Sequence, residues 1–239
     1  MKKLIAITGA SSGIGKELAI KFNQLGHPLL LMARRVELLE QLNLDNCICA
    51  SVDVRNFEQF KEAIKSAEIK YGPVDCLINN AGIMPLDKIY NLSLETQHEM
   101  VDINVKGVLN GINIVVNDMK DRKTGTIINI SSVAGRYTSE NRVVYNGTKF
   151  AVHAISESAR KELAAFNIRV LTIAPALVDT NLIDSTVNQE VIKNYDQWKK
   201  DLDGGLTSQE VAEVITYAYN LPQHISLKEI VLSATKQAI

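Results

Sequence analysis

The side chains of Ser132, Tyr145 and Lys149 have types and spacing suited to proton transfer. Tyr145 and Lys149 are four positions apart, so on a helix they would share one face. A phenol normally keeps its proton until about pH 10, and a nearby ammonium lowers that pKa. We therefore expect Tyr145 to exchange a proton with a carbonyl or alcohol oxygen that also contacts the hydroxyl of Ser132. Alone, a Tyr-x-x-x-Lys pair is more often an ordinary amphipathic pair.

A glycine-rich turn directly follows the first expected strand. Gly9, Gly13 and Gly15 lie between the strand Leu4–Thr8 and the helix expected from Ile14. Backbone N–H groups and the dipole at a helix start attract phosphate, and side chains in the turn would block a pyrophosphate. The spacing predicts a dinucleotide-binding turn; a purely structural turn and another nucleotide-like ligand are the alternatives.

The residues after the second expected strand indicate which dinucleotide binds. A cofactor without a 2′-phosphate usually meets an acidic residue about twenty residues past the glycines, but here Arg34 and Arg35 follow the strand. Two arginines at a helix start oppose the helix dipole, and an anion lying over them would remove this conflict. We therefore predict NADP(H) as cofactor. Two solvated surface arginines are the alternative.

Strand and helix patterns alternate along the whole chain. They predict a single α/β domain over residues 1–239, a Rossmann-type doubly wound sheet of seven parallel strands in the order 3-2-1-4-5-6-7 with helices on both faces. Ligands should bind beyond the carboxyl ends of the strands. Strands are expected over Leu4–Thr8, Pro28–Ala33, Cys47–Val52, Asp75–Asn79, Thr126–Ser131, Ile168–Ala174 and Leu227–Ser233. Helices are expected over Ile14–Leu25, Val36–Leu42, Phe57–Tyr71, Leu94–Met119, Val143–Phe166 and Thr207–Asn220.

The region from Thr180 to Gly205 is polar and less regular. We expect residues 181–205 to form a flap over the site, with Gly204-Gly205 as its hinge. Tyr195 and Trp198 would either line a pocket or only pack the flap.

Two arginines, Arg136 and Arg142, flank the Tyr145–Lys149 pair. They would either meet a substrate carboxylate or be solvated at the surface.

Composition excludes several classes of function. A net charge of −1 gives no indication of nucleic-acid or anionic-membrane binding. No apolar run reaches the length of a membrane span, and the start of the chain has no signal-peptide pattern, so we expect a cytoplasmic protein. The three cysteines and four histidines show no metal-ligand spacing, so no metal site is expected. His153 is expected to be a packed helix residue.

Six short motifs occur in a fixed order along the chain. They are TGASSGIG (Thr8–Gly15), Asp53-Val54, NNAG (Asn79–Gly82), Asn104 in DINVKG, Ser132 in NISS, and YNGTK (Tyr145–Lys149). In this order and spacing they resemble the short-chain dehydrogenase/reductase family, over essentially the whole length. The resemblance implies that Tyr145 is the catalytic acid/base, that Lys149 lowers its pKa and holds the nicotinamide ribose, and that Ser132 positions the substrate oxygen.

Asn104 would support a water that relays protons through Lys149; an amide bonded locally within the helix is the alternative.

The resemblance implies further cofactor contacts beyond the glycine turn and the two arginines. They are Ser11, Ser12 and Ile14 along the pyrophosphate, Asp53 and Val54 at the adenine, Asn80, Ala81 and Gly82 behind the adenine ribose, Asn104, Tyr145 and Lys149 at the nicotinamide end, and Pro175, Val178 and Thr180 around the carboxamide. The chain departs from the family pattern at Ala176, where the family usually has glycine. If the turn needs a positive φ there, we expect strain of roughly 1 kcal/mol.

The activity implied is hydride transfer between NADP(H) and a small alcohol or carbonyl compound. The C-terminal stretch Leu206–Gln237 looks most like reductases of small hydroxy acids, such as serine or 3-hydroxypropionate dehydrogenases. A reductase of carrier-bound 3-oxoacyl groups, a non-catalytic NADP-binding regulator and another Rossmann enzyme, such as a methyltransferase, are the alternatives.

The helices expected over Leu94–Met119 and Val143–Phe166 carry apolar residues on more than one face. Such helices need cover on a second side, and family members commonly pair them across two-fold axes. We therefore expect a homodimer or homotetramer. The apolar residues include Val101, Val105, Val108, Ile112 and Val115.

Overall fold

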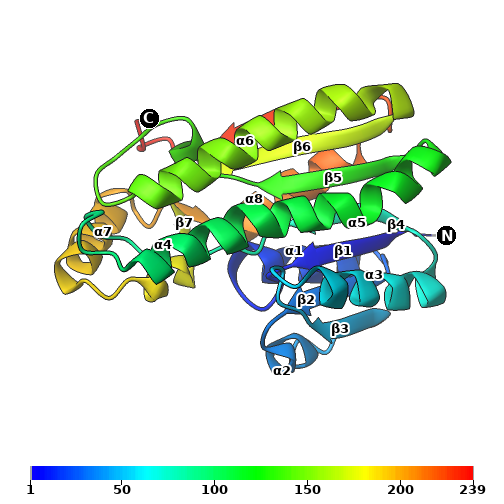
Figure 1. Cartoon of the computed structure of the whole chain (residues 1–239), viewed down its shortest axis with the longest axis horizontal. Helices are drawn as coiled ribbons and strands as arrows, with labels where there is room; N and C mark the ends of the chain where they lie inside the picture. Colours follow the sequence, from blue (N-terminus) through cyan, green and yellow to red (C-terminus); the bar gives the residue numbers. More distant parts are fainter. Residues whose placement is uncertain (1, 239) are drawn as a thin grey trace.

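The computed structural model describes residues 2–238 and contains a seven-stranded parallel sheet (Figure 1). Its strand order is β3-β2-β1-β4-β5-β6-β9, which confirms the predicted order, with β9 as the seventh strand. Short apolar runs form these strands because both faces of the sheet are covered. The strands are β1 (Leu4–Thr8), β2 (Leu29–Ala33), β3 (Cys47–Ser51), β4 (Val74–Asn79), β5 (Gly125–Ile130), β6 (Ile168–Pro175) and β9 (Glu229–Leu232).

Helices cover both faces of the sheet, so the predicted fold class is confirmed. Leu4 and Ala6 of β1 belong to one hydrophobic core, with α3, α5 and α6, while Ile5 and Ile7 belong to the other, with α1 and α8. Figure 1 shows α5 and α6 in front of the sheet and α1 and α8 behind it. The helices include α1 (Gly13–Gln24), α2 (Val36–Glu40), α3 (Phe57–Tyr71), α5 (Gly107–Arg122), α6 (Val143–Leu163) and α8 (Ser208–Asn220).

Most expected elements agree with the structure to within about two residues. The predicted helix α3 has the same bounds in the structure. The helix expected to start at Thr207 does so with a capping box, in which Thr207 and Glu210 satisfy each other's backbone N–H groups. None of the helices in residues 2–238 is long and apolar enough to cross a lipid bilayer.

The prediction of one continuous helix over Leu94–Met119 is wrong in one detail. It is interrupted by a π-helical turn, Asp102–Lys106, which separates α4 (Leu94–Val101) from α5 (Gly107–Arg122). The apolar period continues through this turn, so the sequence pattern alone does not reveal it. Such turns are rare and often lie at functional sites, and this one contains Asn104.

The irregular region predicted from Thr180 to Gly205 is more ordered than expected. It contains a 3₁₀ turn, Asn181–Ser185, and helix α7 (Gln189–Asp201). Two short strands, β7 (Val178–Asp179) and β8 (Leu206–Thr207), pair at its base. Figure 1 shows α7 beyond the carboxyl ends of the sheet strands. The region therefore stands over the place where a ligand would bind.

Candidate active site

A cavity of about 1080 Å³ lies at the carboxyl ends of the strands. Its walls come from the turn after β1, the ends of β2, β4, β5 and β6, the start of α6, and α7. Most residues predicted for the site line it; Gly15 and Asn104 do not. The predicted residues on its wall are Gly9, Ser11, Ser12, Gly13, Ile14, Arg34, Arg35, Asp53, Val54, Asn80, Ala81, Gly82, Ser132, Tyr145, Lys149, Pro175, Val178 and Thr180.

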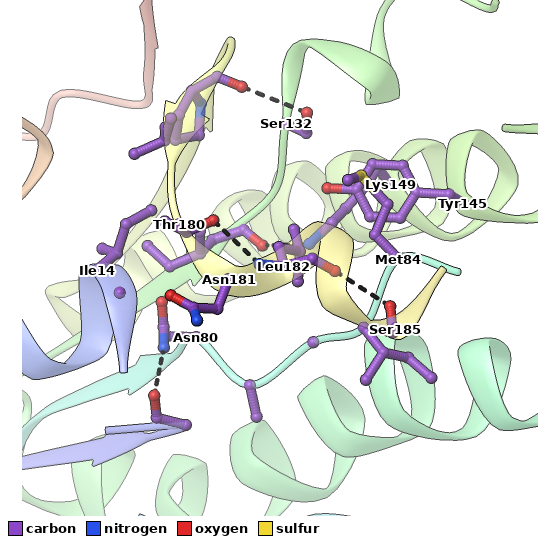
Figure 2. Close-up of a pocket in the computed structure, with 18 of the residues that line it drawn as sticks. Ile14, Asn80, Met84, Ser132, Tyr145, Lys149, Thr180, Asn181, Leu182 and Ser185 are labelled. Atoms are coloured by element: carbon purple, nitrogen blue, oxygen red, sulfur yellow. Dashed lines mark hydrogen bonds between the residues drawn. The ribbon is translucent and has the colours of Figure 1, made fainter. Parts of the chain in front are cut away.

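Tyr145 and Lys149 lie on the first turns of α6, and Ser132 lies just after β5. The Lys149 ammonium is 5.6 Å from the centre of the Tyr145 ring. Figure 2 shows the two side chains next to each other, with Ser132 beyond them on the same cavity. The Ser132 hydroxyl donates to the carbonyl of Pro175 at 3.3 Å. The structure thus brings the three predicted side chains to one wall.

Burial decides the protonation of Tyr145. It is only 6% exposed, and burial raises the pKa of Tyr145 to about 12, while the Ser132 hydroxyl and the Arg142 charge act in the opposite direction. The expectation that the pKa of Tyr145 is lowered is therefore wrong for this structure. The phenol keeps its proton at physiological pH, which makes it a proton donor.

Lys149 is also buried, at 6% exposed, and desolvation lowers its pKa to about 8. Its ammonium donates a hydrogen bond to the carbonyl of Ile130 at 2.9 Å. The Lys149 backbone carbonyl accepts from the Ser131 hydroxyl at 3.1 Å. The end of β5 therefore fixes the position of Lys149 relative to Tyr145.

The structure contradicts the alternative that the Asn104 amide bonds within its own helix, while the support of a water beside Lys149 stays a prediction. The side-chain oxygen of Asn104 accepts from the N–H of Ile83 at 2.9 Å, and its side-chain nitrogen donates to the Ile83 carbonyl at 2.9 Å. The same nitrogen donates to the Thr148 hydroxyl at 3.2 Å. The amide thus ties the loop after β4 to α6, rather than bonding within its own helix.

The glycine turn is shaped by contacts with the loop after β4. Gly9 has φ +64°, and a Cβ there would lie 2.8 Å from the Ala81 Cα; a Cβ on Gly15 would lie 2.4 Å from the Gly9 carbonyl oxygen. The side chain of Asn80 donates to the carbonyls of Thr8 and Gly9 at 3.0 and 3.1 Å, and Figure 2 shows Asn80 reaching toward this turn. Asn80 therefore holds the turn, in addition to lining the cavity.

The turn fits a bound pyrophosphate. The first turn of α1 carries no acidic residue, and Ser11, Ser12 and Gly13 at its start line the cavity. The N–H groups and the dipole of α1 therefore face an open space without a competing negative charge.

The far end of the cavity, at β2 and β3, carries both cations and a carboxylate. The Arg34 guanidinium is 4.0 Å from Glu99, with its side chain 60% exposed, and within residues 2–238 Arg35 has no carboxylate in ion-pair distance. The Arg55 guanidinium donates to the Asp53 carboxylate through Nε at 3.0 Å and Nη2 at 2.6 Å, and these hydrogen bonds lower the pKa of Asp53. Arg34 and Arg35 therefore retain positive charge that can meet a phosphate.

The turn after β6 forms without the predicted strain. Ala176 is not among the residues of the described chain with positive φ, and its N–H donates to the Leu232 carbonyl at 2.8 Å. The alanine is therefore tolerated because this turn does not use the left-handed region. Thr180, further along, lies against Gly13, whose Cβ position would be 3.2 Å from a Thr180 methyl carbon.

Arg136 and Arg142 have different environments. Arg136 does not line the cavity; it donates to Glu229 at 2.7 Å. Glu229 also forms a hydrogen bond with His153, whose other ring nitrogen is bonded to the Ser131 hydroxyl. His153 is thus a packed helix residue, as expected. Arg142 lines the cavity, so only one of the two arginines can meet a substrate there.

Helix α7 contributes an aromatic pair to the cavity wall. The rings of Tyr195 and Trp198 meet edge to face, with centroids 5.7 Å apart. Both packing within the flap and lining a pocket therefore apply. Sequence reasoning missed Met84 and Gln237, which also line the cavity. Met84 lies two residues past Gly82, which could have indicated it, whereas Gln237 is far in the sequence from every predicted site residue and carries no such signal.

No group of three or more His, Cys, Asp or Glu side chains within residues 2–238 is placed to hold a metal ion.

Comparison with known protein families agrees with this geometry. Residues 3–191 match the model of the short chain dehydrogenase family. The chain belongs to this family. It is accordingly an oxidoreductase of the short-chain dehydrogenase type.

Relatives of this short-chain dehydrogenase match it over nearly the full length. An uncharacterized oxidoreductase of Listeria monocytogenes is 38% identical, over 98% of this chain and 97% of the relative. Among solved structures, the closed form of a serine dehydrogenase complexed with NADP⁺ has a TM-score of 0.90 at 29% identity, covering 99% of this chain and 96% of that one. An alcohol dehydrogenase of the archaeon Thermococcus sibiricus, complexed with 5-hydroxy-NADP, has a TM-score of 0.87 at 25% identity, covering 100% and 99%.

Proposed function

We propose that this short-chain dehydrogenase transfers a hydride between NADP(H) and a small alcohol or carbonyl compound. The observation that carries the proposal is one continuous cavity with a glycine turn and two arginines at one end and Ser132, Tyr145 and Lys149 at the other. When bound, the dinucleotide supplies or accepts the hydride at its nicotinamide ring. The protein supplies binding, orientation and the proton.

Tyr145 is the proton donor in the direction of reduction. The Ser132 hydroxyl would turn from the Pro175 carbonyl to donate to the carbonyl oxygen of the substrate. With Tyr145 donating to the same oxygen, the substrate's carbonyl carbon becomes more electrophilic. As a C–H bond forms at that carbon, the C=O π electrons move to oxygen, which takes the Tyr145 proton. The phenol is protonated at neutral pH because burial holds its pKa at about 12, so the acid is ready in the ground state.

Lys149 acts on the phenolate that this transfer leaves behind. With a pKa of about 8, Lys149 is mainly an ammonium at pH 7. Its charge stabilises the phenolate as it forms. This interaction stabilises the transition state more than the ground state, so it lowers the barrier. Asn104 holds the loop that contains Gly82 against α6, and so positions the wall that faces Lys149.

The preference for NADP(H) rests on Arg34 and Arg35. An arginine suits a phosphate dianion because its guanidinium can donate two parallel hydrogen bonds. The serine dehydrogenase and the archaeal alcohol dehydrogenase, which resemble this chain in fold, were solved with NADP⁺ and an NADP derivative. The Asp53 carboxylate does little to neutralise Arg34 and Arg35, because it is already paired with Arg55.

Cofactor affinities test this preference. The Kd values of NADPH and NADH are measured by the fluorescence of the reduced nicotinamide in the wild type, in Arg34→Ala and in Lys65→Ala, an exposed control on α3. We expect the wild type to bind NADPH at least about tenfold more tightly, and Arg34→Ala to lose most of this difference. Equal wild-type affinities for the two cofactors would contradict the proposal.

We further propose that copies of the chain associate through α4, α5 and α6. Of the apolar residues expected on a second face, Val108, Ile112 and Val115 are buried within the chain itself. Val101, at 41% exposed, and Phe150, at 42%, do lie on the surface. A dimer or tetramer by light scattering, reduced to smaller species in Phe150→Glu, is the expected result; a wild-type monomer would contradict it.

A further inference from the structure

The charges around the cavity are unequally distributed. Its wall carries two carboxylates, Asp53 and Asp184, and the cationic side chains of Arg34, Arg35, Arg142 and Lys149. The first two arginines lie at the β2 end, far along the wall from Tyr145, and Lys149 is bonded to the backbone of Ile130. Arg142 is therefore the guanidinium available at the reacting end.

Arg142 has no carboxylate partner. Within residues 2–238 it forms no ion pair, whereas Arg136, six residues earlier, is neutralised by Glu229. Arg142 also precedes the first turn of α6, where the helix dipole disfavours a cation. A half-buried guanidinium in this place lacks a compensating anion, which a ligand in the cavity can supply.

The Arg142 side chain is held on the aromatic pair of α7. Its guanidinium carbon lies 5.1 Å from the centre of the Trp198 ring and 6.0 Å from that of Tyr195. Stacking on aromatic rings stabilises a guanidinium while leaving its in-plane N–H donors free for a planar anion. The arrangement therefore orients the donors without using them.

Arg142 is close to the group that donates the proton. It lies three residues before Tyr145 at the start of the same helix, and its charge lowers the pKa of Tyr145 against the effect of burial. An anion on Arg142 and a carbonyl oxygen on Tyr145 can therefore belong to one small molecule. Both side chains line the same cavity, so one small molecule placed there can contact both.

We propose that Arg142 binds the carboxylate of a small 2- or 3-hydroxy acid, or of the matching oxo acid, and thereby selects acids over neutral alcohols. The proposal rests on the proposed function of the cavity. It assigns the stacked Arg142–Trp198 pair to substrate recognition, so helix α7 takes part in selecting the substrate.

The fluorescence of the chain's single tryptophan, Trp198, reports ligand binding without requiring turnover. Trp198 emission is followed in the NADP⁺-bound protein as lactate, 3-hydroxypropionate or their neutral amides are added. We expect a saturable change with at least one acid, and binding of its amide at least tenfold weaker. In Arg142→Gln, binding of the acid should weaken about 100-fold while that of the amide changes less than threefold. Arg142→Lys should be intermediate, and Arg136→Gln should resemble the wild type.

Three results would overturn the proposal: no saturable response to either acid, equal binding of acid and amide by the wild type, or equal weakening of both in Arg142→Gln. The last would mean that Arg142 only shapes the wall. Reduction of neutral aldehydes and ketones with NADPH, measured in parallel, keeps the two ideas separate. Turnover of neutral compounds without selection of acids leaves the proposed function standing and removes the role of Arg142; absence of turnover with every compound removes the proposed function.

Discussion

Replacing Lys149 with methionine should make the protein more stable at neutral pH. Burial lowers the Lys149 pKa from its usual 10.5 to about 8, so the folded chain holds a charge that the solvent would stabilise better. At about 1.4 kcal/mol for each pH unit, the cost is about 3 kcal/mol. The lost hydrogen bond to the Ile130 carbonyl removes about 1 kcal/mol of this gain. The net stabilisation of Lys149→Met is therefore about 2 kcal/mol, or roughly 4–8 °C in Tm for a chain of this size.

The dependence on pH identifies the cause. Because the folded-state pKa is lowered, the cost is absent above pH 10.5, accumulates as the pH falls toward about 8, and is constant below that. The advantage of Lys149→Met should thus be full at pH 7 and vanish at about pH 10. Above pH 10.5 only the loss of the hydrogen bond, about 1 kcal/mol, should remain. Thermal unfolding of the cofactor-free protein, at fixed concentration between pH 7 and 10, measures it, with the exposed Lys65→Met as control. A destabilised Lys149→Met whose deficit does not vary with pH would refute the reasoning.

Three further predictions concern the charge of Lys149 and the packing around two glycines. The kcat/KM for carbonyl reduction should fall as the pH rises through about 8, because Lys149 then loses the charge that stabilises the Tyr145 phenolate; a rate that is constant up to pH 10 would contradict this. Gly15→Ala should cost about 1–3 kcal/mol in urea unfolding, since its Cβ would lie 2.4 Å from the Gly9 carbonyl oxygen. Gly147→Ala, on helix α6 with nothing within 4 Å of the new Cβ, should instead stabilise by about 0.5–1 kcal/mol; equal effects of the two substitutions would be inconsistent with the described packing.

The sheet and the glycine turn could be predicted from the sequence because local signals determine them. Buried apolar runs such as Leu29–Ala33 can only be strands covered on both faces or core helices, and their length decides between the two. The turn at Gly9 follows from its position between a strand and a helix. Similarly, the i and i+4 spacing of Tyr145 and Lys149 needs only the helix to place both side chains together.

Properties that depend on distant contacts could not be predicted. The partner of Asn104 is the backbone of Ile83, 21 residues away, and no periodicity reveals such a bond. The direction of the Tyr145 pKa shift depends on burial by several elements, which here outweighs the nearby charges. Helix α7 is a different case, because it buries none of its residues fully, yet Val191, Tyr195 and Trp198 recur at helical spacing. This spacing could have predicted the helix.

The replacement Tyr145→Phe tests the central claim most directly. We expect carbonyl reduction with NADPH to fall by about 100- to 10,000-fold, as for loss of a general acid, while the Kd of NADPH changes less than about threefold. Tyr90→Phe, at a tyrosine that is 81% exposed and outside the cavity, should leave both values unchanged. A Tyr145→Phe variant that keeps most of its activity would contradict the assignment of Tyr145 as the proton donor.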